Sequence, residues 1–388
     1  MPKTYRIAIV GCGRIAAKTV SGVADLREHF HSIIFIDPNP EARQRIVEEA
    51  KKLNLPDIHQ SASLSEALTD YAHIDLVAIS TPPATHYSIA REALEAGAHL
   101  LLEKPAVLKL ADGLELIYLA KQRGLKIATC YIYRFYPGIL ELSQFIQRAG
   151  LGELCDGRLK IDWGHDQAYY DAAPWRGTWE REGGVLLNQS VHGLDLINFL
   201  SGHRGLLASA AKLEQRCHQL EAEDSAWARL GDGDGFSYEI EASTAPERRN
   251  PQESFETVRA IELQLRGTTG QLRLVFDKSR RLPLKFKLRA PKLRIGNIKA
   301  YAFLLKSLFH TPGFKRNLRQ LKNPHAAILA DTLTRMEGGH GRLDNHDLLS
   351  GLEEALSIYA AALDRHAVEN RDRIKSFDLC EMRDYFKS

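Results

Sequence analysis

Three polar side chains near residue 190 have the types and spacing of a proton-transfer site. The segment reads Gly183-Gly184-Val185-Leu186-Leu187-Asn188-Gln189-Ser190-Val191-His192-Gly193-Leu194-Asp195. In a helix that begins near Leu187, the residues Asn188, His192 and Asp195 lie at i, i+4 and i+7 on one face. Histidine ionises near pH ~6.5 and a carboxylate can fix its tautomer, so we expect His192 to be a general base oriented by Asp195. The Asn188 amide cannot relay a proton and can only hold substrate or histidine by hydrogen bonds.

A lysine stands where a second catalytic group is expected. In the motif Glu103-Lys104-Pro105, Lys104 directly follows the apolar run 99–103, which reads as a buried strand. Ligands of open α/β sheets bind at the carboxyl ends of the strands. The proline keeps Lys104 in an extended or turn conformation. We therefore expect Lys104 to polarise a substrate oxygen at this edge, a role that requires no metal ion.

The N-terminus carries a dinucleotide-binding fingerprint. An apolar strand, 7–10, runs directly into Gly11-Cys12-Gly13-Arg14-Ile15-Ala16, a G-x-G-x-x-A turn. Such a turn lets backbone N–H groups approach a pyrophosphate at a helix N-terminus, so Gly11, Gly13, Arg14 and Ile15 are expected to bind the cofactor.

Asp37, at the end of the next apolar run, is expected to accept hydrogen bonds from the ribose 2′-hydroxyl. Its charge repels a 2′-phosphate, and Pro38-Asn39-Pro40 supplies no cation. The pattern therefore predicts NAD in preference to NADP.

The elements that must position these residues form two domains. Apolar runs alternate with amphipathic segments through residues 1–133, which predicts a doubly wound parallel sheet, a Rossmann domain. From 134 to 388 the pattern predicts an α+β domain for substrate binding and oligomerisation, with a mainly antiparallel sheet. The strands expected there are 159–163, 226–230, 236–242, 261–266 and 271–276, and the helices are 187–200, 324–336 and 346–370.

Composition excludes several other classes of protein. The 388 residues are 44% hydrophobic and 26% charged, as in ordinary globular proteins. The five cysteines are scattered without ligand spacing, so neither a disulfide framework nor a zinc site is expected. There is no apolar run long enough to span a membrane and no N-terminal signal pattern, and we expect a cytoplasmic protein.

Several further motifs occur in a recognisable order. They are Thr81-Pro82-Pro83-Ala84-Thr85-His86, Glu103-Lys104-Pro105, Tyr133-Arg134-Phe135-Tyr136-Pro137, Trp175-Arg176-Gly177-Thr178-Trp179 and the segment 183–195. With the glycine fingerprint, they resemble the Gfo/Idh/MocA family of NAD(P)-dependent sugar and inositol dehydrogenases over most of the chain.

The resemblance implies specific roles and a subunit arrangement. Lys104 would touch both nicotinamide and the substrate hydroxyl, next to a proline that commonly follows a cis bond. It also implies a homo-oligomer, a dimer or tetramer formed through the C-terminal sheet. The remaining cofactor contacts implied are Thr81, Pro82, His86, Glu103, Trp175 and Arg176. The substrate contacts implied are Lys104, Tyr133, Arg134, Tyr170, Asn188 and His192.

The chain departs from many relatives at one position. Those relatives have Asp four residues before the histidine, where this chain has Asn188. The Asn-Gln-x-x-His pattern, with Tyr169-Tyr170 and the tryptophan block, resembles the nucleotide-sugar 3-dehydrogenase branch, which makes aminosugar precursors of surface polysaccharides.

These observations predict an NAD-dependent oxidoreductase that reversibly oxidises a secondary sugar hydroxyl, with C3 as the expected position. One alternative is a glycosidase that works by transient NAD-dependent oxidation. Another is a dinucleotide-sensing regulator without catalysis, against which the presence of both Lys104 and His192 argues. Because one fold hosts many functions, the fold alone does not choose among them.

The segment 278–322 is unusually basic. It holds 14 Lys and Arg residues and no Asp or Glu. We expect it to follow the last strand of the second sheet, with a rather apolar helical stretch at 298–309. A subunit contact or solvated loop is the favoured interpretation. Peripheral association with an anionic membrane surface or a sugar-phosphate carrier is the alternative. Nucleic acid is not expected, because no recognition motif accompanies the charge.

Overall fold

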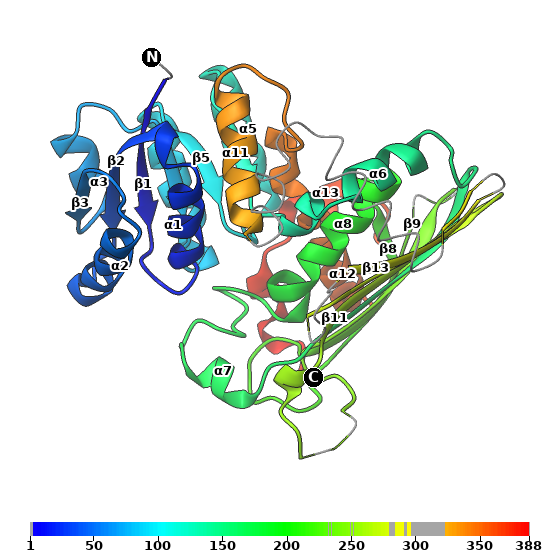
Figure 1. Ribbon diagram of the computed structural model, residues 1–388. Coiled ribbons are helices and arrows are strands. Elements are labelled where there is room, and N and C mark those ends of the chain that lie inside the picture. Colours follow the sequence, from blue (N-terminus) through cyan, green and yellow to red (C-terminus); the bar gives the residue numbers. More distant parts are fainter. Residues whose placement is uncertain are drawn as a thin grey trace. The chain divides into compact units, whose positions relative to one another are not determined.

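The computed structural model describes residues 3–387 except 232, 234, 249, 251, 279–283, 291–292 and 296–322. The chain divides into two compact units, which are described separately. The described parts of 1–107, 111–136 and 313–349 form the first unit, and those of 108–110, 137–312 and 350–388 form the second (Figure 1).

The first unit is built on a sheet whose strands are all parallel. In the described chain its six strands have the order β3-β2-β1-β4-β5-β6. Their bounds are β1 Tyr5–Val10, β2 Phe30–Ile36, β3 Ile58–Ser61, β4 Leu76–Ile79, β5 His99–Leu102 and β6 Ile127–Thr129. Val10 pairs with Ile36 on one side and Ile79 on the other, so the strand order reverses at β1. This switch point is where such sheets bind ligands, and the predicted Rossmann topology is confirmed.

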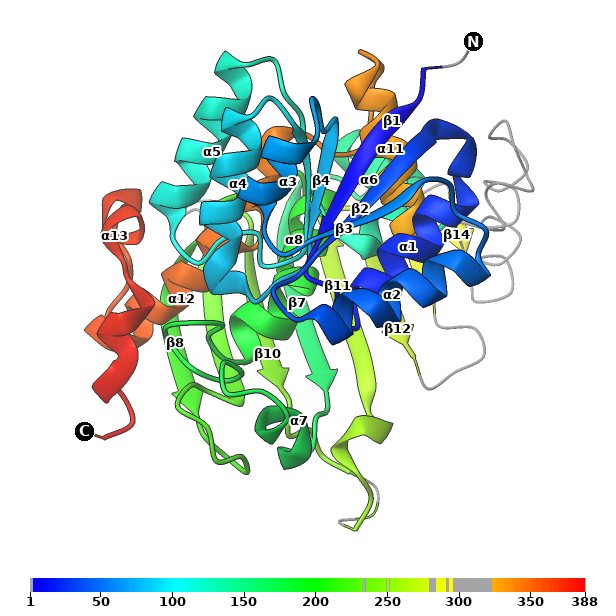
Figure 2. The ribbon, with the colours of Figure 1, turned by 90° about the vertical axis from the view of Figure 1, so that its left-hand side faces the viewer.

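Helices cover both faces of this sheet (Figure 2). α1 and α2 pack on one face, against alternate residues of β1 and β2, and α3, α4 and α5 lie on the other. Asn39 caps α2 by accepting hydrogen bonds from the N–H groups of Glu41 and Ala42, and Ser63 caps α3. The bounds are α1 Ala16–Asp25, η1 Arg27–His29, α2 Pro40–Lys52, α3 Leu64–Asp70, η2 Pro83–Thr85, α4 His86–Glu95, α5 Leu110–Gln122 and η3 Ile132–Phe135.

The chain returns to this unit after completing the second sheet. α11 (Pro324–Met336) packs against α1, and η6 (Asn345–Leu349) follows it. Arg335 Nη1 donates to the Ile127 carbonyl at 2.8 Å, and Asn345 Oδ1 accepts from the Ile127 N–H at 2.8 Å. These side chains supply hydrogen-bond partners for the backbone groups of Ile127 at the outer edge of the short strand β6. The structure therefore differs from a simple boundary at 133/134, because the edge of the first sheet is completed by residues from near the C-terminus.

The second unit is built on a mainly antiparallel sheet, as predicted. Its eight described strands have the order β14-β13-β12-β11-β7-β10-β9-β8, and β7 and β10 pair in parallel. The bounds are β7 Leu154–Trp163, β8 Leu207–Glu214, β9 Ser225–Gly231, β10 Ser237–Ser243, β11 Arg259–Gly267, β12 Gln271–Asp277, β13 Leu284–Ala290 and β14 Leu293–Ile295. Together the two sheets confirm the predicted fold class.

This sheet extends further than the sequence predicts. Three of its strands, β8, β13 and β14, were not predicted, and the last two lie inside the basic segment. In β13 the buried Leu284 and Leu288 alternate with the more exposed Lys285, Lys287 and Arg289, so the two leucines join the core. The helix expected at 298–309 lies outside the described residues.

Helices cover one face of the second sheet. α8 packs on β7 and β11, and α12 packs on β8. The helix expected at 346–370 is interrupted at Gly351, whose φ is +75° and whose added Cβ would lie 2.8 Å from the Val191 carbonyl oxygen. The bounds are α6 Ile139–Gln147, α7 Gln167–Asp171, η4 Leu186–Ser190, α8 Val191–Ser201, η5 Phe255–Thr257, α12 Leu352–Asp364, α13 Arg371–Ser376 and η7 Leu379–Asp384.

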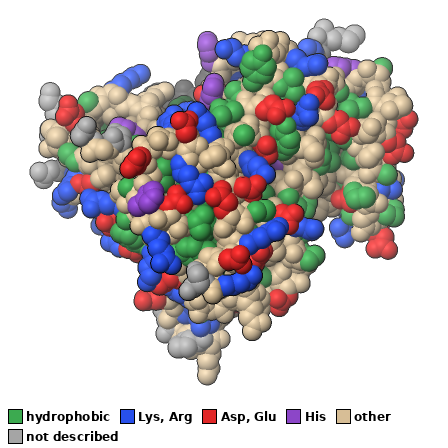
Figure 3. Space-filling view, turned by 180° about the vertical axis from the view of Figure 1, so that it is seen from behind, with side chains coloured by type: hydrophobic (Ala, Val, Ile, Leu, Met, Phe, Trp, Pro, Cys, Tyr) green, Lys and Arg blue, Asp and Glu red, His purple; other side chains and the backbone are tan. Residues whose placement is uncertain are grey.

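On the face drawn in Figure 3, basic and acidic side chains are interspersed rather than gathered by sign. None of the described helices has the length and apolar composition needed to cross a bilayer.

A buried carboxyl group joins α12 to α8. Glu354 Oε1 accepts hydrogen bonds from Asn198 Nδ2 at 2.8 Å and from the Gly205 N–H at 2.7 Å. Its other oxygen, Oε2, is buried without a hydrogen-bond partner among the described residues. Burial is the main reason that the pKa of Glu354 rises to about 7. The folded protein therefore holds a proton on Glu354 that the unfolded chain releases between about pH 4.5 and 7.

Replacing Glu354 by glutamine should flatten the pH dependence of stability. In the wild type the free energy of unfolding falls as pH rises through this window, because the folded state binds the extra proton. Glutamine keeps an oxygen for Asn198 and Gly205 but cannot ionise. We expect the variant to gain about 1–3 kcal/mol relative to the wild type between pH 5 and pH 8 in urea unfolding. The exposed Glu369→Gln variant is the control, and equal slopes for all three proteins would contradict the assignment.

Candidate active site

The glycine turn after β1 forms a cradle open to a ligand. Gly11 has a φ of +89°, and a Cβ there would lie 2.9 Å from the Ser80 backbone, so only glycine fits. Gly13 has no atom within 4 Å of an added Cβ, so its backbone faces open space. Arg14 and Ile15 follow, and Ile15 is the N-cap of α1. A bare backbone at a helix N-terminus fits the pyrophosphate of a dinucleotide.

Asp37 is held beside this turn. Its Oδ2 accepts from the Cys12 N–H at 2.9 Å and its Oδ1 accepts from the Asn39 N–H at 2.9 Å. A cation that was not predicted lies here, because Arg43 from the first turns of α2 donates through Nη1 to the Asp37 carbonyl oxygen. The motif around Asp37 therefore includes a positive charge that Pro38-Asn39-Pro40 alone does not supply.

His86 joins the loops that follow β4 and β5. Its Nε2 lies 2.8 Å from the Thr81 carbonyl oxygen and its Nδ1 lies 2.9 Å from that of Pro105. The ring is 1% exposed, and burial is the main reason that its pKa is lowered. Pro105 follows a cis peptide bond, as the resemblance implied. The structure thus places His86 as a clamp on the loops that carry Thr81, Pro82 and Lys104.

The carboxylate that precedes Lys104 has a partner that the sequence analysis missed. Glu103 Oε1 lies 3.3 Å from His325 Nε2 of α11, and both side chains are largely buried. Burial alone would raise the pKa of Glu103, but the hydrogen bond and charge of His325, with the charge of Lys104, bring it below its usual value. A residue 222 positions away therefore keeps Glu103 ionised beside Lys104.

Two residues that the resemblance assigned to substrate lie in the core of the first unit. Tyr133 is 2% exposed and stacks on Tyr136 with ring centroids 5.7 Å apart. Arg134 is 1% exposed, and its Nη1 lies 2.8 Å from Oδ2 of the equally buried Asp347. These contacts indicate structural roles, and substrate contact by either residue stays a prediction.

The segment that carries His192 begins differently from the expected α-helix. Residues Leu186–Ser190 form a π-helical turn, and the α-helix begins at Val191. The prediction that Asn188 and His192 lie on one face of a continuous α-helix is therefore wrong, because Asn188 lies in the π-helical turn and His192 in the α-helix. Single π-turns inside helices are frequent at functional sites.

Glu223 explains how this turn is held. Its Oε1 accepts from the Leu186 N–H at 3.0 Å and from the Tyr359 hydroxyl at 2.8 Å, and its carbonyl accepts from the Val185 N–H at 3.0 Å. A Cβ on Gly184 would lie 2.2 Å from the Glu223 carbonyl oxygen, so the glycine is required for this approach. Burial raises the pKa of Glu223 to about 7. Glu223 was not among the residues predicted from the sequence.

Two of the polar side chains predicted to act in this segment are buried. Asn188 is 7% exposed and Asp195 is 1% exposed. Asn188 Nδ2 donates to Glu182 Oε1 at 2.7 Å and to the Tyr169 hydroxyl at 3.1 Å. His192 and Asp195 lie one turn apart in α8. Their catalytic roles stay predictions.

The aromatic block divides into two environments. Tyr170, predicted to contact substrate, is 7% exposed and its hydroxyl donates to Thr244 Oγ1 at 2.8 Å, which places it in the core. Its neighbour Tyr169 instead contacts Asn188. The Arg176 guanidinium lies 4.1 Å from the Tyr169 ring centroid and 5.3 Å from that of Trp175. Cofactor contact by Trp175 and Arg176 stays a prediction.

Known proteins resemble this arrangement. The model described as "Oxidoreductase family, NAD-binding Rossmann fold" matches residues 5–131, and the GFO/IDH/MocA C-terminal domain matches 139–273. Together they cover more than half of the chain. The protein therefore belongs to the Gfo/Idh/MocA family of oxidoreductases, and its first unit is an NAD-binding Rossmann domain.

Individual relatives are more distant. The chain is 32% identical over 164 residues to an uncharacterised oxidoreductase of Synechocystis, covering 42% of this chain and 43% of that protein. It is 28% identical over 203 residues to a UDP-N-acetylglucosamine 3-dehydrogenase of Acidithiobacillus ferrooxidans, covering 52% and 54%. The chain thus spans about half the length of the curated relatives it matches.

A solved structure shares the whole fold. The WlbA dehydrogenase of Bordetella pertussis, solved in complex with NADH and UDP-GlcNAcA, matches with a TM-score of 0.78 at 23% identity. The match covers 95% of this chain and 98% of that one.

No group of three or more His, Cys, Asp or Glu residues is placed to hold a metal ion within the described part of this chain.

Proposed function

We propose that the protein is an NAD-dependent oxidoreductase that reversibly oxidises a secondary hydroxyl of a sugar. The observation that carries this proposal is that a chain with both family domains also has Lys104 in its Glu-Lys-Pro loop and His192 in the π-to-α segment. A regulator that only senses a dinucleotide requires neither group.

The protein side of the reaction follows from these groups. His192 accepts the proton of the substrate hydroxyl, and Asp195 fixes the orientation of its ring. Lys104 orients the same oxygen and stabilises the negative charge that develops on it. When bound, NAD would supply the acceptor for the hydrogen that leaves the substrate carbon as hydride. Gly11, Gly13, Arg14, Ile15 and Asp37 would hold the cofactor.

The finer proposal is a nucleotide sugar oxidised at C3. It is supported by the Asn-Gln-x-x-His pattern and by the relative named as a UDP-N-acetylglucosamine 3-dehydrogenase. Screening nucleotide sugars and free sugars with NAD, while recording the absorbance of reduced nicotinamide, tests it. We expect a signal from at least one nucleotide sugar. Turnover of free sugars alone would reject the nucleotide sugar, and no signal from either set would reject the proposed function.

Preference for NAD over NADP is a separate prediction that rests on Asp37. A carboxylate at this position repels a 2′-phosphate, and the nearby Arg43 is engaged with the Asp37 carbonyl oxygen. Asp37→Ala should remove the repulsion and leave Arg43 to attract the phosphate. We expect the ratio of the NADP to the NAD dissociation constant, measured by calorimetry, to fall roughly tenfold or more. Tighter binding of NADPH than NADH by the wild type would contradict the assignment.

Three further proposals concern the surroundings of the protein. We propose a homo-oligomer formed through the second sheet, as the family resemblance suggests. We propose a reducing, cytoplasmic location from the scattered cysteines, which are all free. Association of the basic segment with an anionic surface stays the alternative to a subunit contact, and its described cations include Lys278 and, in β13, Lys285, Lys287 and Arg289.

A further inference from the structure

A buried carboxylate outside the predicted site controls the Asn188 amide. Glu182, which is 4% exposed, accepts from Asn188 Nδ2 at 2.7 Å through Oε1 and from the Gly177 N–H at 2.9 Å through Oε2. Both oxygens of Glu182 act as acceptors in these contacts. Glu182 therefore decides which end of the Asn188 amide faces it, and that end is the NH₂ group.

The rest of the network follows from this choice. The second N–H of Asn188 points to the Tyr169 hydroxyl at 3.1 Å. The amide oxygen accepts from Gln189 Nε2 at 2.8 Å. Gln189 Nε2 also lies 3.1 Å from His165 Nε2, which accepts from it, and His165 Nδ1 lies 3.8 Å from Glu256 Oε1. One carboxylate thus sets the donor direction of four side chains.

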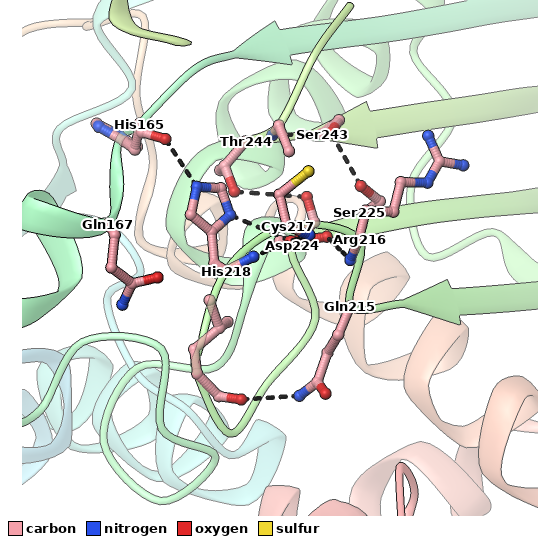
Figure 4. Close-up of polar contacts among 12 residues, drawn as sticks. His165, Gln167, Gln215, Arg216, Cys217, His218, Asp224, Ser225, Ser243 and Thr244 are labelled. Atoms are coloured by element: carbon pink, nitrogen blue, oxygen red, sulfur yellow. Dashed lines mark hydrogen bonds and ion pairs between the residues drawn. The ribbon is translucent and has the colours of Figure 1, made fainter. Parts of the chain in front are cut away.

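The far end of this network is anchored in the second sheet. The backbone N–H of His165 donates to the Thr244 carbonyl at 3.0 Å. The His165 ring stacks on the Tyr169 ring with centroids 3.7 Å apart. His218 Nε2 donates to the His165 carbonyl at 2.8 Å, as Figure 4 shows. His218 is itself held by the buried Asp224, at 3.1 Å through Nδ1.

We propose that Glu182 is a positioning residue for the reaction, and that Glu182 and Asn188 form a matched acid–amide pair. The proposal rests on the proposed function, because Asn188 lies in the π-turn that leads directly into the helix of His192. With both N–H groups directed into the protein, Asn188 can meet a sugar hydroxyl only as an acceptor. The pair therefore fixes both the π-turn and the polarity that position 188 presents to a substrate.

The pair predicts that aspartate at position 188 is not a conservative change. In Asn188→Asp, two carboxylates would face each other across the 2.7 Å now spanned by a hydrogen bond. Like charges at this distance force the pair to share a proton or to separate. The reciprocal change, Glu182→Gln with Asn188→Asp, restores one donor and one acceptor. The introduced glutamine then donates to the introduced aspartate and keeps an oxygen for Gly177, and the Tyr169 hydroxyl reverses to donate.

The experiment is a double-mutant cycle over Glu182→Gln, Asn188→Asp and the double variant, with kcat/KM against pH and Tm as readouts. We expect Asn188→Asp to lose roughly 10- to 100-fold in kcat/KM and to lower Tm. Its kcat/KM relative to the wild type should recover as pH falls, when the pair takes up the shared proton. The double variant should regain most of the loss and show no such recovery.

A second buried acid–amide pair in the same unit provides the control. Asn198 Nδ2 donates to Glu354 Oε1 at 2.8 Å, and because Glu354 holds a proton below about pH 7, the two pairs are compared above that pH. The effects of Asn198→Asp and Glu354→Gln on Tm should be non-additive when the two changes are combined. The same changes should leave kcat/KM unchanged. Coupling in kcat/KM at the Glu182 pair, and not at this pair, supports a positioning role rather than a structural one.

The outcomes separate this proposal from the proposed function. An active wild type whose double variant is as impaired as Asn188→Asp would overturn the pair and leave the sugar oxidation intact. A wild type that oxidises no sugar, with coupling in Tm alone, would overturn the proposed function and with it the role of the pair in the reaction.

Discussion

Replacing either His192 or Lys104 by alanine is expected to lower turnover by roughly 10²–10⁴-fold, the range for loss of a positioned acid or base. His192 is expected to take the hydroxyl proton, and Lys104 to stabilise the charge left on the oxygen. Steady-state rates on the substrate found by the screen measure the effect. Because His192 is not among the residues expected to hold NAD, His192→Ala should bind NAD as the wild type does.

Two exposed residues provide matched controls for this experiment. His340 lies beyond α11 and Lys121 lies in the last turn of α5, and both are exposed. His340→Ala and Lys121→Ala should keep wild-type turnover. Near-normal rates in His192→Ala or Lys104→Ala, measured beside these controls, would show that the assigned roles are wrong.

The largest loss of stability is expected from removing Asp347. Its ion pair with Arg134 is 1% exposed on both sides, so Asp347→Ala leaves a buried guanidinium without its counter-charge. Breaking a buried pair in this way destabilises by about 3–5 kcal/mol. Urea unfolding followed by circular dichroism measures the change.

The exposed pair of Arg158 and Glu241 is the control for that measurement. Their side chains are 54% and 38% exposed, and Glu241→Ala should change stability by less than about 1 kcal/mol. Replacing both Arg134 and Asp347 by apolar residues should be less damaging than Asp347→Ala alone. An Asp347→Ala variant as stable as Glu241→Ala would contradict a buried, uncompensated charge.

The sequence predicts those parts of the fold that depend on local patterns. The continuous apolar runs of β1, β2, β4 and β5 are typical of a parallel sheet buried on both faces, and glycines mark several helix ends. β13 was missed because its alternation, Leu-Lys-Phe-Lys-Leu-Arg, lies within a cationic segment that reads as solvated. The break at Gly351 was missed because the close approach of the Val191 carbonyl is a tertiary contact.

The candidate site divides in the same way. Gly11, Asp37, Lys104 and His192 stand out because their types and local spacing already indicate chemistry. The buried groups that hold the site do not stand out, because each is chosen by a partner distant in sequence or by a turn of unusual geometry. Glu223 meets the π-turn 37 positions away, and His325 meets Glu103 222 positions away. No local pattern predicts such pairings.

The central claim is net oxidation of a sugar hydroxyl that uses both Lys104 and His192. The most direct test is to quantify NADH and keto sugar together over many turnovers of the wild-type protein. The account predicts one NADH for each keto sugar formed, and strong loss of both products in His192→Ala. Cleavage of a glycosidic bond with a cofactor that is recycled and never accumulates as NADH would contradict it, and so would binding of NAD without any change in a sugar.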